Sequence, residues 1–111
     1  MKLTCIVHYR TLWGETLYIS GDSPTLGSWD EAKARPLTYT PDDQWLIELE
    51  LPEPSPSDLT YKYLVRDEEG RISRREGLLH HHITLRRDVD RTYAFDSWLD
   101  TPPDAPSFSV A

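Results

Sequence analysis

Sulfur is scarce in this sequence of 111 residues, which holds one cysteine, Cys5, and one methionine. A single thiol cannot form an intramolecular disulfide, and it cannot build a thiolate metal cluster. We interpret Cys5, which alternates with polar residues in an apolar-faced segment, as an inert buried thiol. A Cys–His nucleophile is the alternative, and nothing in the sequence supports it.

Positive charge is also in short supply. Twelve Lys and Arg residues stand against nineteen Asp and Glu residues, which gives a net charge of −7. Nucleic-acid binding needs a basic stripe, and an anionic membrane surface attracts basic clusters, so we expect neither partner. A neutral sugar is indifferent to this charge, so a glycan ligand remains permitted.

Long hydrophobic runs are missing. The opening letters MKLTCIVH lack the apolar stretch of a signal peptide, and no segment approaches membrane-spanning length. We therefore expect a cytoplasmic protein. No cofactor or metal is expected either, since the run His80–His82 lacks the spacing of zinc ligands. Consecutive strand residues point to alternate faces, and we interpret these histidines as solvated.

Helical periodicity is absent as well, and short segments alternate apolar with polar residues between turn signals instead. This pattern predicts an all-β protein of about seven to eight strands, a sandwich or a barrel. The clearest strand covers 45–51, whereas residues 32–40 are ambiguous. The other predicted strands cover residues 3–9, 16–20, 61–65, 83–85 and 92–95, with one more near residue 72.

The length fits one domain, which we place at residues 1–98. Residues 101–111 hold three prolines and small polar side chains, so we interpret 99–111 as a linker or as the start of a further segment.

Aromatic side chains are plentiful, with four tryptophans and six tyrosines. Trp13 and Trp29 lie in glycine turns, which predicts exposed rings. Trp45 shares the apolar face of its strand and is predicted to be core, as are Tyr61 and Tyr63. We expect Trp98 to cap the end of the fold. Exposed aromatic planes suit sugars, because one face of a glucose ring is lined with C–H groups.

Four motifs, in this order and at these intervals, resemble the family-20 carbohydrate-binding module, or starch-binding domain. They are WGETLYISG at 13–21, LGSW at 26–29, QWLIELELP at 44–52 and TYKY at 60–63. The resemblance implies an immunoglobulin-like antiparallel β-sandwich that binds α-1,4-glucan without doing chemistry on it. It implies two sites, the first with Trp29 and Lys62 and the second with Trp13 and Tyr39.

The sequence departs from this family at one place. Where the resemblance implies a second tryptophan of the first site, the chain has Arg74, Arg75 and Glu76. The first site is therefore either weakened or rebuilt with an arginine lying against the sugar, and Glu76 is a candidate acceptor for a sugar hydroxyl. Each site is shallow, so we expect affinities in about the micromolar-to-millimolar range, with avidity where both engage one polymer.

The segments LVRDEEG at 64–70, DSW at 96–98 and PSF at 106–108 are similar to the amino-terminal modules of plant-type 4-α-glucanotransferase. This similarity implies a covalently linked glucanotransferase domain as partner. Two rivals stay open. One is an immunoglobulin-like protein-interaction domain that uses the exposed tryptophans as its interface, and the other is a small hydrolase with two facing carboxylates.

Overall fold

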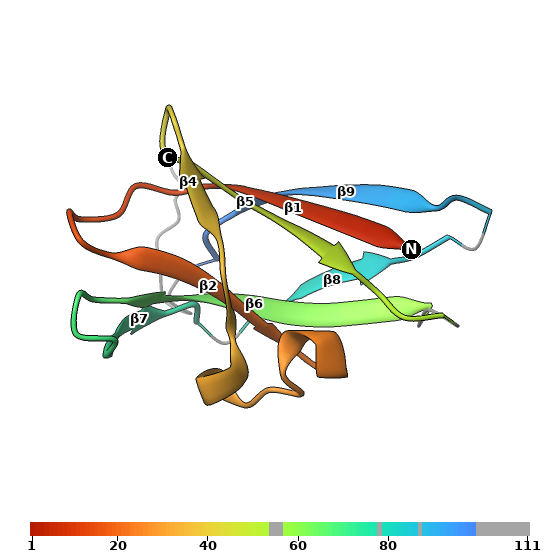
Figure 1. Ribbon diagram of the computed structural model, residues 1–111, viewed down its shortest axis with the longest axis horizontal. Helices are drawn as coiled ribbons and strands as arrows, with labels where there is room; N and C mark the ends of the chain where they lie inside the picture. Colours follow the sequence, from red (N-terminus) through yellow and green to blue (C-terminus); the bar gives the residue numbers. More distant parts are fainter. Residues whose placement is uncertain (54–56, 78, 87, 100–111) are drawn as a thin grey trace, which may run out of the picture.

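The computed structural model describes residues 1–53, 57–77, 79–86 and 88–99, and it contains nine strands in two sheets that face one another (Figure 1). Two 3-10 turns, η1 (Pro24–Leu26) and η2 (Glu31–Lys33), lie between the second and third strands. The strands are β1 (Lys2–His8), β2 (Thr16–Gly21), β3 (Arg35–Pro36), β4 (Thr38–Thr40), β5 (Gln44–Glu50), β6 (Asp58–Arg66), β7 (Ile72–Arg75), β8 (His81–Thr84) and β9 (Arg91–Ser97).

The strand order confirms the predicted immunoglobulin-like sandwich. One sheet runs β4-β5-β1-β9 and the other runs β3-β2-β6-β7, while β8 pairs with the first half of β6. Neighbouring strands are antiparallel except β1 and β9, which are parallel from Lys2↔Arg91 to His8↔Ser97. The prediction of a wholly antiparallel sandwich is wrong for this pair, because the first and last strands close one sheet side by side.

The core lies between the two sheets and is formed by alternate residues of the long strands. Trp45, Tyr61 and Tyr63 are buried there, as their strand patterns predict. Trp98 packs against the edge of the core and stacks on Tyr9 with ring centroids 4.4 Å apart. The remaining core side chains are mostly aliphatic. Most of them come from β1, β2, β5 and β6, and the others are Leu26, Leu37, Leu51, Leu85 and Ala94. No described helix is long and apolar enough to cross a membrane.

The ambiguous residues 32–40 hold η2 and the two shortest strands, so no single period describes them. The linker predicted at 99–111 lies outside the described residues except for Leu99.

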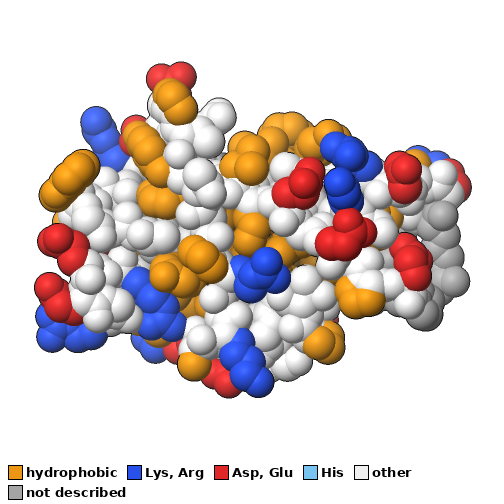
Figure 2. Space-filling view, in the orientation of Figure 1, with side chains coloured by type: hydrophobic (Ala, Val, Ile, Leu, Met, Phe, Trp, Pro, Cys, Tyr) orange, Lys and Arg blue, Asp and Glu red, His pale blue; other side chains and the backbone are white. Residues whose placement is uncertain are grey.

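The outer face of the β4-β5-β1-β9 sheet carries an apolar row. Leu46, Ile6 and Phe95 lie directly across from one another on β5, β1 and β9. Phe95 is 77% exposed. Figure 2 views the sandwich from the side with this sheet uppermost, and it shows hydrophobic side chains along the upper edge and in the middle of the view, with charges of both signs among them.

The inert thiol predicted for Cys5 leads to a chemical test. Cys5 is fully buried, and burial raises the pKa of its thiol to about 12. We expect no measurable alkylation by iodoacetamide at pH 8 in the native protein, because the thiolate is the nucleophile and this sulfur is neutral and inaccessible. Mass spectrometry after an hour of treatment checks this, with the denatured protein as the reactive control. Alkylation of the native protein at the denatured rate would contradict the placement.

Candidate functional site

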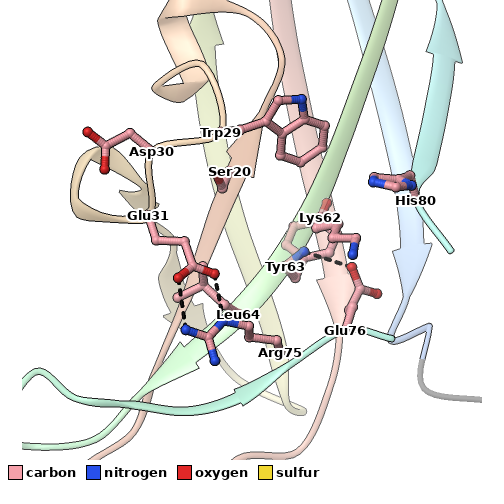
Figure 3. Close-up of a pocket in the computed structure, with 10 residues that line it drawn as sticks. All are labelled: Ser20, Trp29, Asp30, Glu31, Lys62, Tyr63, Leu64, Arg75, Glu76 and His80. Atoms are coloured by element: carbon pink, nitrogen blue, oxygen red, sulfur yellow. Dashed lines mark hydrogen bonds and ion pairs between the residues drawn. The ribbon is translucent and has the colours of Figure 1, made fainter. Parts of the chain in front are cut away.

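Two surface hollows contain the tryptophans singled out by the sequence. The Trp29 pocket has a volume of about 430 Å³ (Figure 3) and the Trp13 pocket about 560 Å³. The first is lined by Ser20, Trp29, Asp30, Glu31, Lys62, Tyr63, Leu64, Arg75, Glu76 and His80. The second is lined by Thr11, Leu12, Trp13, Gly14, Glu15, Thr16, Leu37, Tyr39, Asp43 and Trp45. The residue pairs that the resemblance implies therefore each share one pocket.

A tight turn presents Trp29 to solvent. Three consecutive residues, Gly27, Ser28 and Trp29, have φ angles of +87°, +51° and +67°. Only the glycine adopts this left-handed conformation without cost, so the surrounding structure holds the other two in place. The backbone N–H of Trp29 donates to the carbonyl of Gly21 at 2.7 Å, which ties the turn to the end of β2. Trp29 is 41% exposed, which leaves part of the residue available to a ligand.

Lys62 reaches the same pocket from the middle of β6, opposite Ser20 on β2. Its Nζ donates to the carbonyl of Gly77 at 2.8 Å. An ammonium group has three donors, so one hydrogen bond orients the amine and leaves donors for a ligand.

The arginines that replace the expected second tryptophan diverge, because neighbouring strand residues point to opposite sides. Arg75 enters the Trp29 pocket, where Nε and Nη2 donate to the Glu31 carboxylate at 2.6 and 2.9 Å. Arg74 turns away, pairs with Glu15 at 2.6 Å and lies over the Tyr9 ring. Of the two, Arg75 is the arginine that lies in the pocket with Trp29.

A second ring in the Trp29 pocket escaped the sequence analysis. The imidazole of His80 meets the Trp29 indole edge-on, with centroids 5.3 Å apart and planes at 71° (Figure 3). The sequence has no Phe, Tyr or Trp between Tyr63 and Tyr93, so a search for these three aromatic residues finds no second ring. Treating the histidine run as a source of planar groups would have identified it.

Glu76 does not present a free carboxylate to the pocket. Its side chain has no exposed surface, and Oε1 accepts from the backbone N–H of Tyr63 at 2.7 Å. Oε2 accepts from the backbone N–H of Leu99 at 2.5 Å and lies 2.7 Å from Nε2 of His81. The role expected from the sequence, acceptor for a sugar hydroxyl, conflicts with this burial. Glu76 instead supports the floor of the pocket.

The interpretation of all three histidines as solvated is wrong for His81. Its side chain is buried between Glu76 and Asp96, with Nδ1 3.5 Å from Oδ1 of Asp96. Burial alone would lower the pKa of His81, but the two carboxylates outweigh it and raise the pKa to about 9. Burial likewise opposes ionisation of Asp96, yet hydrogen bonds from His81, Tyr61 and Tyr63 lower its pKa.

The Trp13 pocket is built on a loop that precedes β2. Trp13 is 96% exposed beside Gly14, whose φ is +85°. Oε1 of Glu15 accepts from the backbone N–H of Leu12 at 2.7 Å, which fixes the loop. Tyr39 is half-exposed, meets Trp45 edge-on at 5.1 Å and donates its hydroxyl to Asp43 at 3.2 Å. The pocket thus combines the fully exposed ring of Trp13 with the ring of Tyr39, which contacts with Trp45 and Asp43 hold in place.

The chemistry of these pockets favours binding over catalysis. A glycosidase needs a general acid whose pKa is raised, whereas the hydrogen bond from Arg75 lowers the pKa of Glu31. Both oxygens of Glu76 already have partners. Within the described residues, no group of three His, Cys, Asp or Glu side chains is arranged to hold a metal ion. Shallow hollows with rings and a few polar groups fit a neutral, ring-shaped ligand.

The chain was compared with known proteins both by sequence and by structure. A family model described as "Starch binding domain" matches residues 1–94. The cyclomaltodextrin glucanotransferase of Klebsiella oxytoca is 38% identical over 68 residues, which cover 61% of this chain and 10% of that protein. The chain therefore spans about a tenth of the length of this relative.

Two solved structures share the fold. The family 15 glucoamylase from Hypocrea jecorina superposes with a TM-score of 0.77 and 21% identity, over 87% of this chain and 17% of that one. The family 20 carbohydrate-binding module of the maltotetraose-forming amylase from Pseudomonas saccharophila gives a TM-score of 0.67 and 19% identity, over 86% of this chain and all of that one.

Proposed function

Because the chain belongs to the starch-binding domain family, we propose that it binds α-1,4-glucan at both the Trp29 pocket and the Trp13 pocket without doing chemistry on it. The observation that carries the proposal is that each pocket is built around an exposed tryptophan which the backbone holds in a fixed turn. A glucose ring packs its C–H face on such a plane, while its hydroxyls reach the polar rim. In the Trp29 pocket that rim includes Lys62 and Arg75.

Titration with β-cyclodextrin tests this function, because the ligand mimics one turn of an α-1,4-glucan. We expect saturable binding at two sites in the wild type, followed by heat and by tryptophan fluorescence. Trp29→Ala and Trp13→Ala should each weaken one site at least about tenfold and leave the other in place. The reason is that each substitution removes the stacking surface of its own pocket only.

Phe95→Ala is the matched control, since it removes an exposed ring that lines neither pocket. Its binding curve should overlay that of the wild type. A wild type that stays silent up to high millimolar ligand would overturn the glucan function.

We further propose that the module serves a 4-α-glucanotransferase in the cytoplasm, to which it is covalently linked. The support is the similarity of segments 64–70 and 96–98 to the modules of that enzyme, together with a curated relative that is itself a glucanotransferase. Production of longer maltodextrins from maltotriose by the whole parent protein tests this. Release of glucose with no longer products would point to a hydrolase parent instead.

A protein-interaction function that uses the exposed tryptophans as its interface is the second candidate, and the 96% exposure of Trp13 favours it. The titration above discriminates between the two functions, because a protein interface would leave tryptophan fluorescence insensitive to sugar.

A further inference from the structure

Two pairs of neighbouring residues, Glu76 with Gly77 and His80 with His81, lie at the floor of the Trp29 pocket or directly beside it. The carbonyl of Gly77 accepts a hydrogen bond from the ammonium group of Lys62 at 2.8 Å. His80 meets the Trp29 indole edge-on. Both an amine and a ring of the pocket are therefore positioned by the same few residues.

Glu76 and His81 are joined with Asp96 in one buried ionic cluster. Nε2 of His81 lies 2.7 Å from Oε2 of Glu76, and its Nδ1 lies 3.5 Å from Oδ1 of Asp96. The imidazole stacks on Tyr61 at 5.2 Å and meets Tyr63 edge-on at 5.0 Å. The titratable groups in contact with His81 are Glu76, directly after β7, Asp96 of β9, and Tyr61 and Tyr63 of β6. Cys5 of β1 interacts with Asp96 and with the two tyrosines.

From this geometry we propose that His81 is a positioning residue for the Trp29 pocket, and that its loss of charge at alkaline pH weakens glucan binding there but not at the Trp13 pocket. The proposal rests on the proposed glucan-binding function of the Trp29 pocket. His81 does not line the pocket. It acts through Glu76, which it holds against the backbone N–H groups of Tyr63 and Leu99.

The charge balance of the cluster gives the direction of the effect. A charged imidazole has two N–H donors and serves both carboxylates, whereas a neutral one has a single donor and leaves one carboxylate facing a lone pair. Burial disfavours the charged form, but Asp96 and Glu76 outweigh it and raise the pKa of His81 to about 9. A histidine pKa raised on folding stabilises the fold fully below about 6.5, its unfolded value, and that stabilisation is lost as pH rises through about 9.

The affinity for β-cyclodextrin between pH 7 and 9.5 tests the proposal in two backgrounds. Trp13→Ala leaves the Trp29 pocket to be measured alone, and Trp29→Ala leaves the Trp13 pocket. We expect the Trp29 pocket to weaken at least about fivefold and the Trp13 pocket to change less than twofold. Adding Lys62→Arg to the Trp13→Ala background should preserve this loss of affinity with pH, since a guanidinium stays charged throughout the range. Adding His81→Gln to the same background should abolish the pH dependence.

Nuclear magnetic resonance of the ligand-free wild type gives a reading that depends neither on sugar binding nor on a variant that folds. The imidazole signal of His81, the amide signal of Gly77 and the indole signal of Trp29 should shift with one common midpoint near pH 9. Absence of glucan binding at pH 7 would overturn the proposed function, yet these shifts would still show whether the charge of His81 is coupled to the Trp29 pocket. A His81 midpoint that Gly77 and Trp29 do not share would overturn this coupling itself.

Discussion

Glu76→Gln is expected to lower the free energy of unfolding by about 3 kcal/mol, which is a large effect for a change of one atom. Both carboxylate oxygens accept from donors, namely Tyr63 N–H, Leu99 N–H and the His81 imidazole. A glutamine of the same shape replaces one carboxylate oxygen with an NH2 group, which then faces N–H donors instead of accepting hydrogen bonds from them. Breaking a buried ion pair from one side costs about 3–5 kcal/mol, and His81 keeps Asp96, so the lower end applies.

Thermal unfolding followed by circular dichroism measures this effect, and a loss of roughly 3 kcal/mol corresponds to a fall in Tm of about 12 °C or more. Glu31→Gln is the matched control, because it makes the same chemical change in the same pocket. Glu31 and its partner Arg75 are exposed to solvent, and such surface pairs contribute little to stability. Equal Tm values for the two variants would contradict the structural role assigned to Glu76.

The long strands could be predicted from the sequence because their signal is local. Alternation of apolar and polar residues decides which face is buried, and Trp45, Tyr61 and Tyr63 lie in the core as that rule requires. The exposure of Trp13 and Trp29 followed equally from their glycine turns. The parallel pairing of β1 with β9 could not be predicted this way, since the two strands are more than eighty residues apart in sequence.

The composition of the two pockets could be predicted in part. Motif order placed Trp29 with Lys62, and Trp13 with Tyr39, and the structure brings each pair together. Periodicity alone gives no such pairing, because Lys62 on a strand face resembles any solvated lysine. The resemblance supplied the long-range information that local patterns lack.

The histidines and Glu76 mark the limit of local inference. Burial of a charged side chain is tolerated only when partners from other elements satisfy it, and here Asp96 and Glu76 come from different parts of the chain. No pattern in the sequence around His81 predicts that Glu76 or Asp96 would pair with it. A run of three histidines with alternating orientations therefore contains one pocket ring, one buried ion and one exposed partner of Asp58.

Gly21→Ala is expected to destabilise the domain by roughly 3 kcal/mol and to weaken the Trp29 pocket at the same time. A Cβ atom at Gly21 would lie 2.6 Å from Cδ1 of Leu26, 2.7 Å from the carbonyl oxygen of Thr60 and 3.0 Å from Cβ of Tyr61. Two of these neighbours are fixed in β6, so the end of β2 must move, and overpacking of this kind costs about 1–3 kcal/mol. The carbonyl of Gly21 also accepts the N–H of Trp29, a bond worth about 1 kcal/mol.

Urea denaturation and β-cyclodextrin affinity, measured together, separate this crowding from a general intolerance of alanine. At Gly70 a Cβ meets nothing within 4 Å, and only its φ of +83° opposes substitution. Gly70→Ala should therefore cost about 1 kcal/mol and leave the affinity of the Trp29 pocket unchanged, since this turn joins β6 to β7 away from Trp29. Gly21→Ala should lose stability and Trp29-pocket affinity together while the Trp13 pocket keeps its own. If both alanine variants behaved alike, the close contact at Gly21 would have no energetic consequence, and the anchoring of the Trp29 turn on β2 would be wrong.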